Sequence, residues 1–379
     1  MRPMNFRRTF YPVGQGAFYV EEFKLSEDSK FTIVYDCGST TLGVREFKKR
    51  IKGIFPKEYQ IDVLFISHFH VDHINGIEAL KEHCKIRRVV LPLINNDEET
   101  ILEFSNYIET KKKHSNLIRN PKRYFGEETI IIKIKSISID SRLNEGETRN
   151  ILDIIRDEEL PSGTIFTYPN IDWLFIPFNY KQNERRVEFE ENLRYIGKGL
   201  SLEDIKTIDD IKKYGKELKE AYEAVEGDLN ENSMALYSGP HKNPLYLYPL
   251  FFYRYRYMQF NLFRRYKPLK VYHKKILSGC LYTGDINLNE RNIVEDIEKQ
   301  LGKVMPFIGT LQIPHHGSIH NFKESILENN ISCAVCSFGI KNSYGHPAYT
   351  VIDKVADKEV LPCLVTEDFG TIIIQEGFD

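Results

Sequence analysis

The chain has 379 residues, of which 41% are hydrophobic and 28% charged, the proportions of an ordinary globular protein. Lysine and arginine number 52 against 54 aspartates and glutamates, and the net charge of −2 excludes a globally basic nucleic-acid coat, though not a local basic patch. No apolar run predicts a membrane span, Met1–Thr9 lacks the apolar core of a signal peptide, and six cysteines do not make a disulfide framework. We therefore expect a cytoplasmic protein with no membrane span.

Strand and helix patterns alternate along the first half of the chain, which favours an α/β fold. Apolar or alternating runs predict strands, and apolar residues at helical spacing predict helices. The expected strands are 17–21, 31–36, 61–67, 88–93, one or two within 129–139, and 173–178, and the expected helices are 75–84 and 96–112.

Two segments depart from this pattern. Residues 181–229 are highly charged, and a serine cap at Ser201 followed by apolar residues at helical spacing predicts a helical surface insertion. Residues 240–278 are rich in aromatic and basic residues and contain no acidic residue. Three interpretations are open: a subdomain packed on the helical insertion, a surface for a protein partner or homodimer, and a platform for single-stranded nucleic acid. The candidate nucleic-acid contacts are Arg254, Arg256, Arg264 and Arg265.

The C-terminal part alternates again, and no internal repeat is visible. Expected strands are 233–238, its partner 280–283, 311–314, 331–338 and a final hairpin or strand pair within 364–375, and expected helices are 292–301, 321–328 and 347–356. We interpret residues 1–379 as one domain with two insertions.

The most specific motif is His68-x-His70-x-Asp72-His73, directly after the apolar run 61–66. Imidazoles and a carboxylate suit Zn²⁺, Mn²⁺ or Fe²⁺, and two such ions can share a hydroxide that is nucleophilic at neutral pH. The alternative is a surface loop that is merely rich in histidine. The apolar run argues against it, because a buried strand delivers the loop to a fixed place.

Three further clusters follow predicted strands. They are Tyr282-Thr283-Gly284-Asp285, Pro314-His315-His316-Gly317-Ser318 and Tyr344-Gly345-His346-Pro347. Gly-Asp after a strand is also an ordinary turn, so this motif alone is weak. Functional loops of an α/β sheet gather at the carboxyl ends of its strands, so four such clusters together predict one site.

These motifs resemble those of metallo-β-lactamase-fold hydrolases, and the sequence is similar to the soluble hydrolase domain of ComEC-type competence DNA-uptake proteins. The segments that carry the resemblance are 13–16, 34–38, 66–76, 232–236, 281–285, 313–318, 337–347 and 365–370. The resemblance implies a four-layer αβ/βα sandwich with metals at its seam, and the insertions 181–229 and 240–278 fall between the matching segments.

The resemblance also implies one or two divalent ions, Zn²⁺ or Mn²⁺. His68 and His70 would bind the first ion, Asp72, His73 and His346 the second, and Asp285 would bridge them. One departure concerns the first ion: the family's usual third histidine is missing near Ser233, where Asn230 and Asn232 stand instead. This departure favours one tightly held metal or a preference for Mn²⁺.

Asp36 would support the metal loop without binding metal, and Asp72 would be catalytic together with His315 or His316 at the leaving group. The first hypothesis is a metal-dependent phosphodiester hydrolase, a nuclease acting on DNA, in which a metal-bound hydroxide attacks phosphorus. One alternative is a hydrolase of small carbonyl substrates such as a lactone, a thioester or a β-lactam. Another is a metal-binding subunit of a multiprotein defence system.

Overall fold

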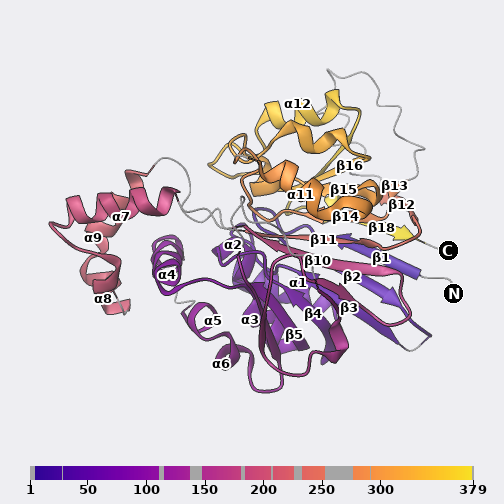
Figure 1. Ribbon diagram of the computed structural model, residues 1–379, viewed down its shortest axis with the longest axis horizontal. Coiled ribbons are helices and arrows are strands. Elements are labelled where there is room, and N and C mark those ends of the chain that lie inside the picture. Colours follow the sequence, from indigo (N-terminus) through magenta and orange to yellow (C-terminus); the bar gives the residue numbers. More distant parts are fainter. Residues whose placement is uncertain are drawn as a thin grey trace.

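Two mixed β-sheets packed face to face form the centre of this computed structural model (Figure 1). The structure describes residues 5–27, 29–110, 115–136, 147–180, 184–205, 208–225, 233–251, 276–290 and 292–377. Within these residues the strand order of the first sheet is β13-β12-β18-β1-β2-β3-β4-β5-β6-β8, and that of the second is β17-β16-β15-β14-β11-β10-β9-β7. The predicted α/β sandwich is confirmed.

The first sheet is antiparallel around β1 and β2 and parallel from β3 to β8. Its strands are β13 (Ile276–Leu277), β12 (Tyr246–Phe251), β18 (Ile373–Gly377), β1 (Asn5–Phe10), β2 (Tyr19–Lys24), β3 (Lys30–Tyr35), β4 (Tyr59–Phe65), β5 (Cys84–Pro92), β6 (Ile130–Ile134) and β8 (Glu158–Leu160). The carboxyl-terminal halves of the parallel strands β4 and β5 are buried, which explains the apolar runs Val63–Phe65 and Val89–Pro92.

The second sheet is parallel from β14 to β17 and antiparallel where β14, β11, β10 and β9 adjoin. Its strands are β17 (Leu361–Val365), β16 (Cys333–Ser337), β15 (Ile308–Gln312), β14 (Gly279–Tyr282), β11 (Met234–Pro240), β10 (Trp173–Asn179), β9 (Ile165–Thr167) and β7 (Thr148–Asn150). The predicted pairing of 233–238 with 280–283 is confirmed, since β11 and β14 pair antiparallel.

Helices cover the outer face of each sheet. Those on the first sheet are α1 (Val44–Ile54), α2 (Val71–Ile74), α3 (Ile77–His83), α4 (Asn96–Thr110), α5 (Ser115–Arg119) and α6 (Pro121–Phe125), and those on the second are α11 (Ile293–Leu301) and α12 (Tyr349–Asp357). The longer helices α1, α11 and α12 each bury apolar residues at helical spacing, as Phe47 and Ile51 do on α1. The arrangement is therefore four layers deep.

The core between the sheets encloses a buried ion pair between Arg8 of β1 and Glu21 of β2. Arg8 Nε lies 2.6 Å from Glu21 Oε1, which also accepts a 2.8 Å hydrogen bond from the Tyr282 hydroxyl. The Ser238 hydroxyl donates to Glu21 Oε2 at 2.5 Å, and Arg8 Nη2 donates to the Ser278 carbonyl at 2.9 Å. This network joins the first sheet to β11 and β14 of the second.

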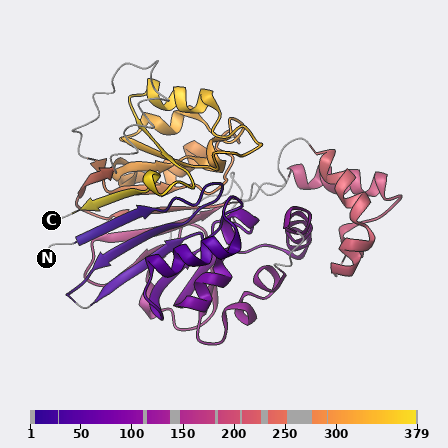
Figure 2. The ribbon, with the colours of Figure 1, turned by 180° about the vertical axis from the view of Figure 1, so that it is seen from behind.

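The segment 181–229 is helical in its described part and lies to one side of the sandwich (Figures 1 and 2). Its helices are α7 (Glu184–Ile196), α8 (Ile208–Lys213) and α9 (Gly215–Glu223). They pack on α4, where Ile101 and Phe104 share an apolar cluster with Phe189 and Leu193. The charged insertion 181–229 therefore packs against α4, and the same helix contacts the loop of His70.

Most of the aromatic and basic segment 240–278 lies outside the described residues. The four candidate nucleic-acid contacts, Arg254, Arg256, Arg264 and Arg265, are among the residues that are not described. Its two ends are described: β12 and β13 pair with each other, and β12 pairs with β18 of the first sheet. The three interpretations of this segment stay predictions.

Two expectations about the elements are wrong. The final strands do not form a hairpin or a pair with each other, because β17 adjoins β16 in the second sheet whereas β18 adjoins β1 and β12 in the first. The segment 321–328 forms only a 3₁₀ turn, Glu324–Glu328. All six cysteines are buried and none forms a disulfide bond. This agrees with the prediction that they do not make a disulfide framework.

Candidate metal centre

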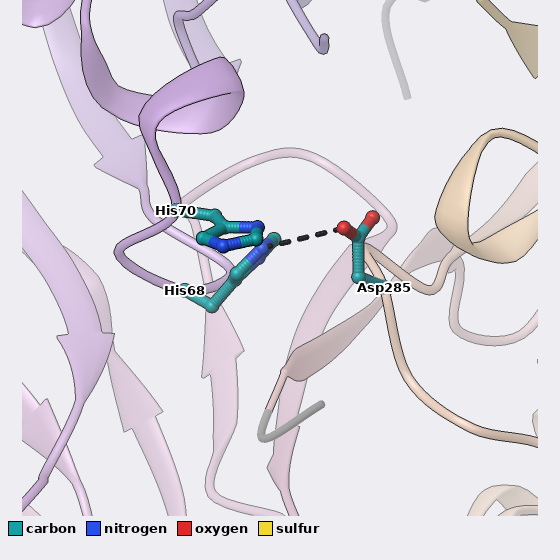
Figure 3. Close-up of side chains that lie close together, drawn as sticks. All are labelled: His68, His70 and Asp285. Carbon is teal, nitrogen blue, oxygen red and sulfur yellow. Dashed lines mark ion pairs between the residues drawn. The ribbon is translucent and has the colours of Figure 1, made fainter. Parts of the chain in front are cut away.

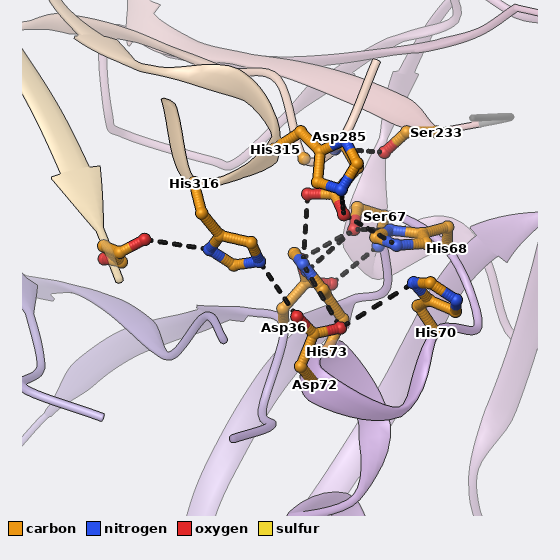
Figure 4. A network of polar contacts seen from close by, with 12 residues as sticks. Asp36, Ser67, His68, His70, Asp72, His73, Ser233, Asp285, His315 and His316 are labelled. Carbon is orange, nitrogen blue, oxygen red and sulfur yellow. Dashed lines mark hydrogen bonds and ion pairs between the residues drawn. The ribbon is translucent and has the colours of Figure 1, made fainter. Parts of the chain in front are cut away.

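Four loops that follow strands β4, β14, β15 and β16 meet where the two sheets adjoin (Figure 4). The first carries His68 to His73, the second Asp285, the third His315 and His316, and the fourth His346. Ring centroids of His315 and His346 lie 5.4 Å apart, and those of His73 and His316 lie 5.6 Å apart. The sequence-predicted clusters therefore come together in one place.

Two groups of three side chains are arranged as metal ligands would be. His68, His70 and Asp285 form one group, and Asp72, His73 and His316 form the other, with ligand atoms within 4.8 Å of one another in each. Figure 3 shows the first group, in which His68 Nε2 lies 3.5 Å from Asp285 Oδ2. Asp285 Oδ1 lies 3.2 Å from His73 Nε2, so this carboxylate stands between the groups.

The donor atoms fit divalent metal ions. Each group offers two imidazoles and one carboxylate, and three protein ligands plus water is the usual catalytic zinc arrangement. His68 Nε2, His73 Nε2 and Asp285 Oδ1 are buried and have no hydrogen-bond partner in the described part of the chain. Buried polar atoms normally have partners, and a bound cation would satisfy all three.

Asp36 orients two of the imidazoles through one carboxylate. It accepts hydrogen bonds from the Ser67 amide at 2.7 Å, the Ser67 hydroxyl at 2.7 Å and His73 Nδ1 at 2.8 Å. The Ser67 hydroxyl in turn accepts a 2.8 Å bond from His68 Nδ1. Both rings therefore carry their proton on Nδ1, which leaves Nε2 of each to face the metal groups, as the predicted supporting role of Asp36 requires.

Asp36→Asn is expected to weaken metal binding about 10- to 100-fold, the usual effect of removing a partner that orients metal ligands. An amide cannot accept all three hydrogen bonds, because one of its ends is a donor. Competition with a chelator measures the metal affinity, and circular dichroism checks the fold. Unchanged affinity in a folded variant would show that Asp36 does not orient these ligands.

His70 is oriented from helix α4. The Ser105 hydroxyl lies 3.4 Å from His70 Nε2, and the Asn106 amide donates a 2.7 Å hydrogen bond to the Phe69 carbonyl. His70 Nδ1 is thereby left on the side of Asp72, 4.0 Å from Asp72 Oδ1. The sequence predicted the helix but gave no sign of this contact, because nothing in a local pattern shows which turn of α4 meets the loop.

The Asp285 loop is held by Gln312 and Ser233, which the sequence did not single out. Gln312 Oε1 accepts hydrogen bonds from the amides of Thr283 and Gly284 at 2.8 and 2.7 Å. Gly284 has φ +54°, and a Cβ there would lie 2.2 Å from Ser233 Oγ. Ser233 Oγ also accepts from the Asp285 amide at 3.1 Å. Glycine is therefore required at 284 by both its backbone angle and its surroundings.

The structure describes only part of the segment in which the family's third histidine for the first ion is missing. Asn230 and Asn232 lie outside the described residues, and Ser233 supplies a hydrogen bond to the Asp285 loop. His241 is exposed and follows the far end of β11, away from the amide of Met234 that bonds to the Ser67 carbonyl.

His315 and His316 both adopt left-handed backbone angles, with φ of 47° and 54°. His316 is buried, donates from Nδ1 to the Ser337 carbonyl at 2.8 Å and bonds through Nε2 to Asp72 Oδ2 at 2.9 Å. His315 keeps 20% of its side chain exposed, and its Nδ1 bonds to Asn321 Oδ1 at 3.0 Å. The two neighbours thus differ: His316 belongs to a ligand group and His315 lies at its edge.

His346 lies beside His315 rather than within either ligand group as described. The atom grouped with Asp72 and His73 is supplied by His316 instead. Burial lowers the pKa of His346 to about 4, so the ring is neutral and able to bind a cation at neutral pH. Its role as a ligand of the second ion stays a prediction.

The charges of the site are strongly coupled. Burial lowers the pKa of His68, and the neighbouring His73 adds to this effect. Burial also disfavours the charged form of His73, but the surrounding carboxylates, first of all Asp285, outweigh it and raise its pKa well above the usual value. Protons shared between carboxylates and imidazoles must leave when a cation binds, so metal affinity rises with pH.

The family model of the metallo-beta-lactamase superfamily matches residues 17–167. A search of curated proteins found no match. Among solved structures, the crystal structure of a long form RNase Z from yeast aligns over 97% of this chain and 41% of its own, with 12% identity and a TM-score of 0.33. The present chain therefore spans less than half of that protein's length.

None of the described helices is long and apolar enough to span a bilayer. The match to the metallo-beta-lactamase superfamily model includes the loop from His68 to His73, and the two-sheet sandwich of the described chain is consistent with the fold of that superfamily.

Proposed function

We propose that this protein is a metal-dependent phosphodiesterase that cleaves nucleic acid, with DNA as its polymer. The observation that carries the proposal is the pair of adjacent buried ligand groups, which meet where Asp285 of the first approaches His73 of the second, with the partly exposed His315 at their edge. Paired divalent ions are typical of nucleases and phosphatases, because together they neutralise charge on phosphate and lower the pKa of water. The choice of DNA rests on the sequence resemblance to ComEC-type hydrolase domains.

The side chains of the candidate metal centre would have different roles in this reaction. His68, His70, Asp72, His73, Asp285 and His316 would hold one or two ions, Zn²⁺ or Mn²⁺. Both ring nitrogens of His316 are engaged, with the Ser337 carbonyl and Asp72, so it is a poor proton donor to substrate.

His315 is the better candidate for the leaving group. Its Nδ1 is tied to Asn321, and its Nε2 lies 4.0 Å from Asp285 Oδ2, on the side of the ligand groups. In the imidazolium form, Nε2 would donate its proton to the departing oxygen as a general acid. Asp72 and Asp285 would orient the attacking water.

The proposal is tested with metal-stripped protein incubated with labelled single- and double-stranded DNA and RNA, with Mn²⁺, Zn²⁺ or no metal. Cleavage is expected only with added metal, and an Asp72→Ala/His73→Ala variant is expected to show none, because it lacks two ligands of one group. A lactone, a thioester and a β-lactam are assayed in parallel. Hydrolysis of one of these, with every polymer intact, would favour the carbonyl hydrolase over the nuclease, and inertness toward all substrates would favour a metal-binding subunit.

A further inference from the structure

A row of aromatic rings leads from the ligand groups to the surface. Ring centroids are 5.6 Å apart between His73 and His316, 6.1 Å between His316 and His315, 5.4 Å between His315 and His346, and 5.9 Å between His346 and Tyr344. Tyr344, the outermost ring, belongs to a residue that is 65% exposed. The proposed reaction assigns this tyrosine no role.

The loop that carries Tyr344 is held by the side chain of Asn342. Its Oδ1 accepts hydrogen bonds from the amides of Tyr344 and His346 at 3.1 and 3.0 Å, and its Nδ2 donates to the carbonyls of Gly339 and His346 at 2.7 and 2.6 Å. Gly345, between the two rings, has φ +73°, an angle that favours glycine. The backbone thus presents an exposed ring in a defined position, which lowers the entropy lost when a ligand stacks on it.

We propose that Tyr344 is a substrate-binding residue, whose ring stacks on the base of a nucleotide next to the scissile phosphate. This inference rests on the proposed phosphodiesterase function and names its substrate as single-stranded nucleic acid. A flat aromatic ring binds any base through its face, whatever the sequence. Bases inside a duplex are stacked on their neighbours and must be extruded before an enzyme can reach them, so a base held this way is unpaired.

The competing explanation is that Tyr344 only supports His346, whose ring lies within 28° of parallel to it. The two explanations differ in what they require of the ligand. A supporting role affects every ligand of the site equally, whereas stacking affects only a ligand that has bases.

The test measures dissociation constants for the metal-loaded protein by fluorescence anisotropy. One probe is a short single-stranded deoxyadenosine oligonucleotide with phosphorothioate linkages, which resist hydrolysis. The other has the same backbone with every base removed. Tyr344→Ala is expected to raise Kd for the first probe about 5- to 150-fold and to leave Kd for the second unchanged. Tyr344→Phe keeps the ring and is expected to bind both probes as the unaltered protein does.

Tyr195→Ala is the matched control, since Tyr195 is 88% exposed on α7, outside the site, and should change neither constant. An unchanged Kd for the base-bearing probe in Tyr344→Ala, or an equal rise for both probes, would overturn the inference. Cleavage of an ordinary phosphodiester oligonucleotide by the same metal-loaded preparation reports separately on the proposed function. A base-dependent loss without any cleavage would refute the hydrolase and support the stacking contact.

Discussion

Asp285→Asn is expected to lower kcat/KM for nucleic-acid cleavage by at least about 10³-fold, which corresponds to the several kcal/mol that metal ions contribute to stabilising charge in the transition state. The carboxylate approaches His68 in one ligand group and His73 in the other, at 3.5 and 3.2 Å. Asparagine keeps the shape but loses the charge and one of the two acceptor atoms. This single substitution therefore lowers the affinity of both ligand groups for a divalent ion.

Steady-state kinetics and metal content, measured on the same preparation, check this expectation. Asp209→Asn is the matched control, because the Asp209 side chain is 88% exposed on α8, away from the ligand groups. The control should keep full activity and metal content. A folded Asp285→Asn protein that retained both would refute the assignment of Asp285 to the metal centre.

Arg8→Met is expected to lower the free energy of unfolding by about 3–5 kcal/mol, the usual cost of breaking a buried ion pair. A total stability of about 5–15 kcal/mol is typical of a folded domain, so the loss would be large. Glu21 would remain as a buried carboxylate that has lost its cation and keeps the hydrogen bonds from Tyr282 and Ser238. Urea denaturation followed by circular dichroism measures the change.

The neighbouring arginine provides the control. Arg7 alternates to the outer side of the same strand, where its side chain is 54% exposed and pairs with Glu376. Arg7→Met should cost less than about 1 kcal/mol, as exposed ion pairs do. The double variant Arg8→Met/Glu21→Leu should be more stable than Arg8→Met, since it buries no unpaired charge. Equal losses for Arg7→Met and Arg8→Met would contradict the structural role of the buried pair.

The clustering of the candidate ligands was largely predictable because these residues are concentrated in short motifs. His68, His70, Asp72 and His73 share one loop, and the rule that functional loops follow parallel strands brought Asp285 and the His315 loop to the same place. The choice between His316 and His346 in the second ligand group was not predictable. It depends on the left-handed backbone at 315 and 316, which places His316 against Asp72.

The residues that orient the ligands escaped prediction for a related reason. Ser105 of α4, Gln312 of β15 and Ser233, directly before β11, reach the site from segments far along the chain, and a single serine or glutamine has no distinctive sequence pattern. Asp36 was identified only through the family resemblance. Its physical role, to set the tautomers of two histidines at once, became visible in the hydrogen bonds alone.

The fold was predictable where a segment is long and periodic. Strand β4 and helix α11 lie close to their predicted ranges, since burial on one or both faces leaves a clear apolar pattern. Strand β1 was missed because Arg7 and Arg8 interrupt its apolar run, although Arg8 faces the core. β17 and β18 are neighbours in sequence but belong to different sheets, because each pairs with strands that lie elsewhere in the chain. The sequence pattern does not show such long-range pairings.

The most direct test of the metal-centre account is a titration of metal-stripped protein with Mn²⁺, in which bound metal per chain and nucleic-acid cleavage are measured together. We expect no cleavage without metal and a rise in cleavage that follows occupancy of the His68 and His73 ligand groups. Folded protein that binds the metal and cleaves no polymer at any occupancy would contradict it.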